Sequence, residues 1–283
     1  MAEFRPIYVN AGFDINVIPR WQMVPNGLSR YVLLRDGVGL DVTAGPPVVR
    51  LTEIDETRLR QDGRSKDALF DPALADMFQK EDRIFEIHGT AEGSTQVRAE
   101  PSRTNAGARL DVQVKKSKTV GLRLYFVSDG RHRTNRYPGE VEPQVDLINR
   151  NIFYPQSNVK FEVLQSSVLT VNFLLSDAMD DDEIGKHIFP LGIQDEGKNV
   201  FFVWNIADKP DDAGYETAGW AQQIGGRNVV IVDSEKPLAQ ILAHELGHAL
   251  GLEHVPNALN LMLKYGKPFN DNLNKSQINI INP

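Results

Sequence analysis

Two histidines, His244 and His248, stand four residues apart in an apolar segment near the C-terminal end of the chain. On a helix this spacing puts both side chains on one face, about 5–6 Å apart at Cβ, so that both imidazoles can reach one ion. Zinc accepts imidazole nitrogens and keeps a position for water when a protein supplies three ligands. Glu245 is rotated away from the two ligands and can contact such a water without binding the metal. The pattern predicts a zinc site with Glu245 as general base.

Gly251 and His254 complete this pattern. The chain has no cysteine, so the ligands of any metal must be histidines or carboxylates. Gly251 comes three residues after His248, where it can adopt a left-handed conformation that ends the helix and turns the chain back. We therefore expect His254 to return to the ion as the third ligand.

The segment HELGHALGLEH, from His244 to His254, resembles the signature of the metzincin clan of zinc endopeptidases, HExxHxxGxxH, at every defining position. The second mark of the clan is a methionine turn beneath the metal. Here ALNLM ends in Met262, at a distance from the third histidine similar to that of the matrixin branch. The resemblance implies a Zn²⁺-dependent endopeptidase that cleaves peptide bonds with a water activated by Glu245, and structural roles for Gly251 and Met262.

Two positions depart from the best-known families of the clan. Val255 follows the third histidine where those families carry Ser, Asp, Glu or Pro, so the resemblance does not select a family. Tyr265 comes three residues after Met262, whereas astacin- and serralysin-type enzymes have a metal-approaching tyrosine two residues after the methionine. We assign Tyr265 no catalytic role.

The elements around the motif can also be predicted. The helix that carries the histidines begins near Ser234, with Asp233 and Ser234 as capping candidates and Pro237 near the first turn. Residues 227–233, RNVVIVD, predict a buried strand before it. The resemblance implies a mixed sheet whose edge strand binds extended substrate, and residues 214–223 are a candidate for the loop or edge near the cleft. The closing segment, residues 273–283, resembles the C-terminal helix that packs behind matrixin-like active sites.

The patterns predict an α+β protein with two domains. Residues 1–117 read as a mostly-β accessory domain, with a sandwich as one arrangement of its strands. In residues 118–283 a strand–helix–strand opening predicts an α/β layer arrangement, and the resemblance implies a metzincin-like catalytic domain with a mixed twisted sheet and an active-site helix. We place the boundary at the hydrophilic stretch KKSK, residues 115–118; the alternative is a charged hairpin turn inside one domain.

Short runs of apolar and β-branched residues predict the strands, and apolar residues at helical spacing predict the helices. In the first domain the predicted strands begin at Tyr31, Val48, Arg83, Ser94 and Ala108, and a short helix begins at Asp71. In the second domain, strands cover 121–127, 159–175 and 198–206, and a helix carries Val141, Val145, Ile148 and Ile152.

The net charge of −7 argues against a general nucleic-acid or anionic-membrane binder, because such proteins need a cationic surface. No apolar run approaches the roughly 20 residues that span a bilayer. The N-terminus has no visible signal peptide, although the resemblance favours an exported or secreted protein, so the sequence leaves the location open. A protein or peptide substrate is the expected partner, and the N-terminal domain is a candidate for binding a partner or substrate.

Other interpretations stay open beside the peptidase. The chain is also compatible with a partner-binding or delivered toxin module in which proteolysis is secondary, or with a zinc hydrolase of a non-protein amide bond. His88, His132 and His187 are scattered, so we favour surface or hydrogen-bonded roles over a second zinc. The acidic run 180–183 favours a solvated turn over a calcium loop. For the aromatic residues Phe201, Phe202 and Trp204 we favour core packing over a substrate pocket, with Trp220 as the exception.

Overall fold

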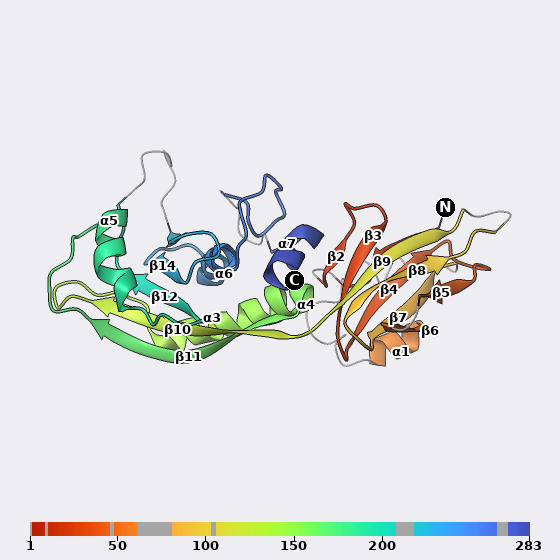
Figure 1. The fold of residues 1–283 in the computed structure, drawn as a ribbon, viewed down its shortest axis with the longest axis horizontal. Coiled ribbons are helices and arrows are strands. Elements are labelled where there is room, and N and C mark those ends of the chain that lie inside the picture. Colours follow the sequence, from red (N-terminus) through yellow and green to blue (C-terminus); the bar gives the residue numbers. More distant parts are fainter. Residues whose placement is uncertain are drawn as a thin grey trace. The chain divides into compact units, whose positions relative to one another are not determined.

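The computed structural model describes residues 2–8, 11–45, 48–61, 81–102, 106–207, 218–264 and 271–283, and the chain forms two compact units (Figure 1). Unit 1 contains residues 1–118, 154–158 and 273–283, and unit 2 contains residues 119–153 and 159–272. The helix predicted from Asp71 falls almost entirely outside the described residues. No helix among the described residues is both long enough and apolar enough to cross a lipid bilayer.

Unit 1 is built mainly from two β-sheets. The first has the order β1 (Glu3–Pro6), β4 (Ser29–Arg35), β7 (Arg83–Gly89), β6 (Val49–Ile54). The second has the order β2 (Phe13–Asp14), β3 (Arg20–Pro25), β9 (Ala108–Lys115), β8 (Gly93–Ala99), β5 (Val42–Ala44). All pairs are antiparallel except β3 with β9, which run parallel. The mostly-β prediction for this part of the chain is confirmed.

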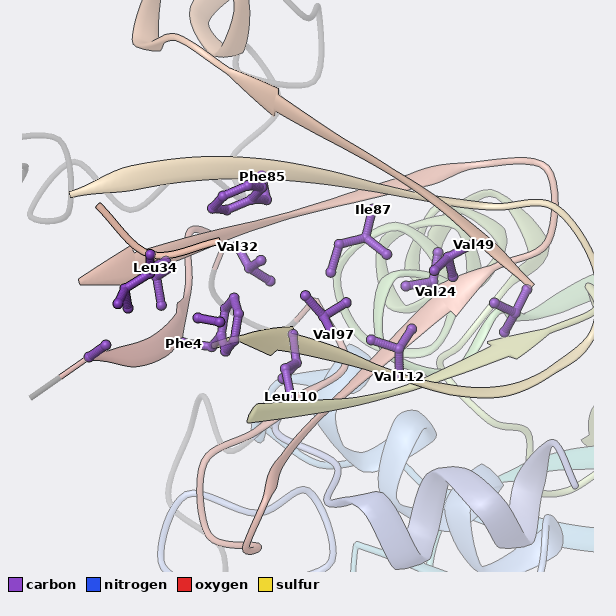
Figure 2. Packing of buried hydrophobic residues seen from close by; sticks show 14 residues of the cluster. Phe4, Val24, Val32, Leu34, Val49, Phe85, Ile87, Val97, Leu110 and Val112 are labelled. Atoms are coloured by element: carbon purple, nitrogen blue, oxygen red, sulfur yellow. The ribbon is translucent and has the colours of Figure 1, made fainter. Parts of the chain in front are cut away.

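The two sheets share a hydrophobic core, in a sandwich-like arrangement. Val32, Leu34 and Ile87 from the first sheet pack with residues such as Val97 and Val112 from the second (Figure 2). The alternate residues of β4, among them Tyr31 and Leu33, point to the other face and form a second cluster with Leu59 of α1 (Glu56–Gln61). Because β4 is buried on both faces, it reads in the sequence as a continuous apolar run.

Unit 1 also includes two helices from distant parts of the chain, α4 (Tyr154–Ser157) and α7 (Lys275–Ile281). The capping box of Asn274 and Gln277 starts α7, and Asp14 accepts a 2.9 Å hydrogen bond from the backbone N–H of Lys275. At the other end, Lys118 Nζ donates to the carbonyl of Ile281 at 2.8 Å. Ammonium groups stabilise the C-terminal end of a helix because its last carbonyls have no partner inside the helix.

Lys115, which belongs to the stretch that we predicted as a hydrophilic boundary, is buried. Its ammonium group donates to the carbonyl of Asn282, just beyond α7. Burial lowers the pKa of Lys115, opposed by nearby Glu92. By its contacts, α7 belongs to unit 1.

Unit 2 contains one mixed five-stranded sheet, as predicted. Its order is β11 (Val159–Thr170), β10 (Lys118–Ser128), β12 (Lys198–Val203), β14 (Asn228–Val232), β13 (Gly219–Ala221). Strands β10, β12 and β14 are parallel, and β13 is antiparallel to β14 at the edge. Residues 159–170 form one strand where we predicted more than one.

The helices of unit 2 include α3 (Pro138–Ile148), which continues into η2 (Asn149–Phe153), and α6 (Leu238–Ala249). The predicted apolar residues Val141, Val145 and Ile148 are buried. Helix α6 packs against α3, β13 and β14. A cluster that includes Phe201 and Val230 covers the sheet on the side of α5 (Asp181–Glu183), η3 (Ile184–Ile188) and η4 (Phe189–Leu191).

Candidate metal centre

Helix α6 carries His244, Glu245 and His248, and it begins at Leu238 without a side-chain cap. The prediction that Asp233 or Ser234 caps it is wrong. The Asp233 carboxylate instead accepts hydrogen bonds from Thr134 Oγ1 and from the backbone N–H of Asn135, both at 2.7 Å. Asp233 therefore connects the loop after β10 to the end of β14. Helix α6 has no side-chain cap at its start and is held by packing against its neighbours.

The structure brings His244, His248 and His254 together. The Nε2 atom of His254 lies 3.2 Å from Nε2 of His244 and 3.1 Å from Nε2 of His248. Among the described residues, these three are the ones whose ligand atoms converge closely enough to hold a metal ion, within 4.8 Å of one another. The convergence of three imidazole nitrogens suits zinc, which binds three protein nitrogens and keeps a further position for water.

Two backbone carbonyls orient the helical histidines. Nδ1 of His244 lies 2.8 Å from the carbonyl oxygen of Leu261, and Nδ1 of His248 lies 2.7 Å from that of Leu252. A carbonyl oxygen can only accept, so each Nδ1 must carry the proton, and each Nε2 keeps a free lone pair. Metal-binding histidines usually have such a partner, which fixes the tautomer and the direction of the ring. The donor set therefore fits zinc.

Burial keeps these imidazoles neutral. It lowers the pKa of His244 to about 4, although the hydrogen bond to the Leu261 carbonyl opposes the shift. Burial also lowers the pKa of His248, with the same kind of opposition from Leu252. Only a neutral imidazole can bind a metal, so at neutral pH both rings are ready to act as ligands.

Glu245 is buried on α6, with only 7% of its surface exposed, next to the first histidine. Its side chain passes close to the edge strand β13, at Gly219. The sequence predicted that Glu245 lies beside the metal-binding histidines. It could not identify Gly219 of β13 as the neighbour of Glu245, because Gly219 comes from a separate segment.

Gly251 ends the helical segment with a φ of +101°. Its backbone N–H donates to the carbonyl of His248 at 2.9 Å, and that of Leu252 donates to the carbonyl of Gly247 at 3.0 Å. This φ is in the region that favours glycine. The turn brings His254 back towards the other two histidines.

Met262 is fully buried under the histidines' helix. A Cβ atom at Gly247 would lie 2.6 Å from the Met262 sulfur, so the glycine admits the methionine against α6. Asn260 accepts a 2.9 Å hydrogen bond from the backbone N–H of Met262 and shapes the turn. A glycine inside a helix destabilises the helix by about 1 kcal/mol relative to alanine. Gly247 inside α6 was therefore a signal of close packing, which the sequence analysis missed.

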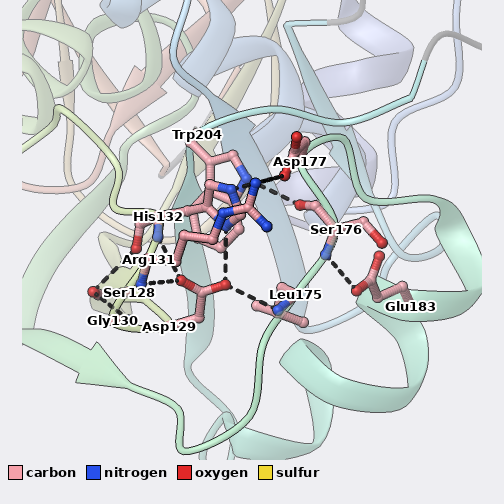
Figure 3. A network of polar contacts seen from close by, with 10 residues as sticks. All are labelled: Ser128, Asp129, Gly130, Arg131, His132, Leu175, Ser176, Asp177, Glu183 and Trp204. Carbon is pink, nitrogen blue, oxygen red and sulfur yellow. Dashed lines mark hydrogen bonds and ion pairs between the residues drawn. The ribbon is translucent and has the colours of Figure 1, made fainter.

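The other histidines lie elsewhere. His132 sits between two carboxylates, with Nδ1 3.0 Å from Asp129 and Nε2 2.9 Å from Asp177, and it stacks on Trp204 (Figure 3). In unit 1, His88 lies 3.1 Å from Ser29 Oγ. His187 is exposed and lies against Phe173.

Asp129 anchors the polar network of Figure 3. Burial alone would raise the pKa of its carboxyl, but hydrogen bonds from the backbone N–H groups of His132, Leu175 and Arg131 and from the His132 ring outweigh burial. The pKa of Asp129 is therefore held far below its ordinary value of 3.8. The network fixes the loops after β10 and β11 and holds no residue of the metal centre.

The aromatic residues mostly pack in the core. Phe201 and Phe202 are fully buried, as predicted. Trp220, which we singled out as a pocket candidate, packs against Phe189 at 5.4 Å between ring centroids, on the sheet face opposite α6. The acidic run contains a helix start, since Asp180 caps α5. Tyr265 and residues 214–217 lie outside the described residues.

Comparison with known proteins gives one family match. Residues 159–282 match the family model of the matrixins. Among solved structures, archaemetzincin from Methanopyrus kandleri has 17% sequence identity, with 58% of this chain and 93% of that chain covered and a TM-score of 0.39. Metalloproteinase-II from Bacteroides fragilis has 14% identity, with 92% of this chain and 84% of that chain covered and a TM-score of 0.39. No curated protein matches the chain.

Proposed function

We propose that this chain is a zinc metalloprotease of the metzincin clan and an endopeptidase in which Glu245 is the general base, with the matrixin match of residues 159–282 in support. The observation that carries the proposal is the convergence of three Nε2 atoms on one point, with Glu245 buried beside them. The Nδ1 contacts to Leu261 and Leu252 add to it, because they leave both Nε2 atoms of α6 free for a metal.

His244, His248 and His254 would hold the ion through Nε2. A zinc ion bound there supplies Lewis-acid polarisation of a carbonyl and acidifies water. The Glu245 carboxylate takes a proton from the attacking water and delivers it to the nitrogen of the leaving amine as the peptide bond breaks. Its burial favours this role, since proton transfer by a carboxylate is more effective where bulk water is excluded.

The edge of the sheet offers a place for the peptide. Strand β13 pairs with β14 on one side and, among the described residues, is the last strand of the sheet. An extended peptide can add to such an edge through backbone hydrogen bonds. We propose this alignment because β13 also packs against α6, the helix that carries Glu245.

The test is cleavage of casein and of a random peptide library by the zinc-loaded protein, with and without a chelator. We expect chelator-sensitive cleavage. Glu245→Ala should keep its zinc and lose about 10³-fold in kcat/KM, in line with the loss of a general base. Glu253→Ala, which removes an exposed carboxylate from the same motif, is the matched control and should cleave normally.

Full peptidase activity in Glu245→Ala would refute the assignment of the base. The two alternatives predict other results. A zinc hydrolase of a non-protein amide bond would leave casein intact and act on other amides, which mass spectrometry of the products identifies. A partner-binding module would capture its partner equally well with and without Glu245.

A further inference from the structure

Gly219 lies on the edge strand β13, which packs against α6. Its partner in the β14 register is Ile231. The next residue, Trp220, points to the opposite face of the sheet, where it contacts Phe189. Side chains alternate between the faces of a strand, so position 219 is directed at the helix that carries Glu245.

A side chain at position 219 has no room. A Cβ atom there would lie 2.9 Å from Cγ of Glu245, 3.1 Å from Cγ2 of Ile241 and 3.2 Å from Cδ1 of Ile231. Carbon atoms in contact prefer about 3.5–4.0 Å. The first of these distances is the shortest, and it involves the middle of the Glu245 side chain.

The backbone gives no other reason for a glycine here. Gly219 is not among the glycines with positive φ, so an L-residue could adopt its conformation. Glycine inside a strand weakens the strand, and it often marks a place where another group approaches closely. The close group at Gly219 is Glu245.

An added methyl group at position 219 cannot be accommodated by a shift of the strand towards β14. Ile231 is fully buried and is paired with position 219 in the sheet. The neighbouring residue Ala218 accepts a 3.0 Å backbone hydrogen bond from Val232. The strand is therefore held on its inner side, and the Glu245 side chain is the part that would have to shift.

We propose that Gly219 is a positioning residue for Glu245: the missing side chain at position 219 provides the space in which the carboxylate-bearing side chain lies against β13. The inference rests on the proposed role of Glu245 as general base. A carboxylate displaced by a fraction of an ångström would still allow zinc and peptide to bind but would transfer the proton poorly.

The first measurement is kinetic and compares Gly219→Ala with the parent protein. We expect kcat to fall about 10- to 100-fold, because misplacement of a catalytic group by about 1 Å costs about 100-fold. KM should stay within about twofold, and zinc content should be unchanged. The matched control is Gly185→Ala, a glycine of η3 with no atom within 4 Å of an added Cβ, which should keep the parent kcat.

The second measurement does not depend on activity. Thermal unfolding is followed for Gly219→Ala in the parent background and in the Glu245→Ala background, where the clashing Cγ is absent. We expect a midpoint lower by a few degrees in the first and a smaller loss in the second, where the contacts to Ile241 and Ile231 remain, because contacting residues give non-additive effects. Equal destabilisation in both backgrounds would overturn the inference.

The kinetic results separate this inference from the proposed function. If the parent protein shows no chelator-sensitive cleavage, the proposed function fails. The unfolding midpoints of Gly219→Ala in the two backgrounds still test whether position 219 contacts Glu245. If the parent cleaves and Gly219→Ala keeps the parent kcat, the positioning role is wrong. A rise in KM with unchanged kcat also contradicts it, since position 219 would then act on the peptide rather than on Glu245.

Discussion

In the metal centre, the histidines, Gly251 and Met262 all come from one continuous segment, whereas unit 1 is completed by residues from three separate parts of the chain. The centre is organised by helical spacing and one left-handed glycine. Unit 1 depends on α7, whose two ends meet Asp14 and Lys118, more than a hundred residues apart in the sequence. Local geometry therefore places the candidate ligands, and long-range contacts complete the fold of unit 1.

The comparison implies that a substitution in the motif lowers zinc binding and peptidase activity but leaves the fold intact. A change in α7 should instead lower the free energy of unfolding of unit 1. The comparison breaks down if ligand variants unfold unit 2, or if variants of α7 leave unit 1 as stable as before.

The largest expected effect is that of His248→Ala on metal binding. Loss of a hydrogen-bond partner of a metal ligand typically lowers metal affinity by about 10- to 100-fold. Loss of the ligand itself should lower zinc affinity by more than that, and peptidase activity should fall to background. Circular dichroism should show the parent fold, because α6 keeps its buried leucines. His187→Ala, an exposed histidine of unit 2, is the control and should bind zinc normally. Retention of stoichiometric zinc by His248→Ala would contradict the ligand assignment.

The second effect is on stability. Deletion of residues 274–283 removes α7 with the fully buried Ile278 and Ile281. At about 1.5–3 kcal/mol for each buried side chain, unit 1 should lose about 3–6 kcal/mol, which denaturant unfolding measures. Ile280→Ala, half-exposed on the same helix, is the control. An unchanged unfolding midpoint after the deletion would show that α7 does not stabilise unit 1.

A smaller effect is expected for Gly251→Ala. At a φ of +101° an L-residue is strained by about 1–3 kcal/mol, so the turn should relax and move His254. We expect about tenfold weaker zinc binding, measured by competition with a chromophoric chelator. Gly185→Ala controls for the added methyl group. Unaltered affinity would mean that His254 reaches the ion without this turn.

The smallest effect concerns Asp129 and appears as a pH dependence. Its folded-state pKa lies below the ordinary value of 3.8, so its contribution to stability is complete above that value and is lost as the pH falls below it. Asp129→Asn should lower the melting temperature at neutral pH and reduce the decline as the pH falls from about 4 towards 2. Equal declines in the parent and the variant would exclude Asp129 as a source of acid sensitivity.

Several features follow from the sequence because they depend on local spacing. The convergence of His244, His248 and His254 and the left-handed conformation of Gly251 were both predicted from the spacing. Most strands of unit 1 followed from alternation and apolar runs, and the mixed sheet of unit 2 followed from the resemblance to the metzincins. The start of α6 was mispredicted, because Asp233 has partners from a distant loop that no local pattern reveals.

The sequence by itself determined which residues could bind zinc, because helix geometry converts spacing directly into direction. Only the tertiary structure decided what surrounds them: the carbonyls of Leu261 and Leu252 that orient the rings, Gly219 beside Glu245, and the attachment of α7 to unit 1. These contacts join residues that are separated in the chain or depend on the path of the turns. Their formation is governed by packing and hydrogen bonding in the folded protein, for which single-residue preferences give no signal.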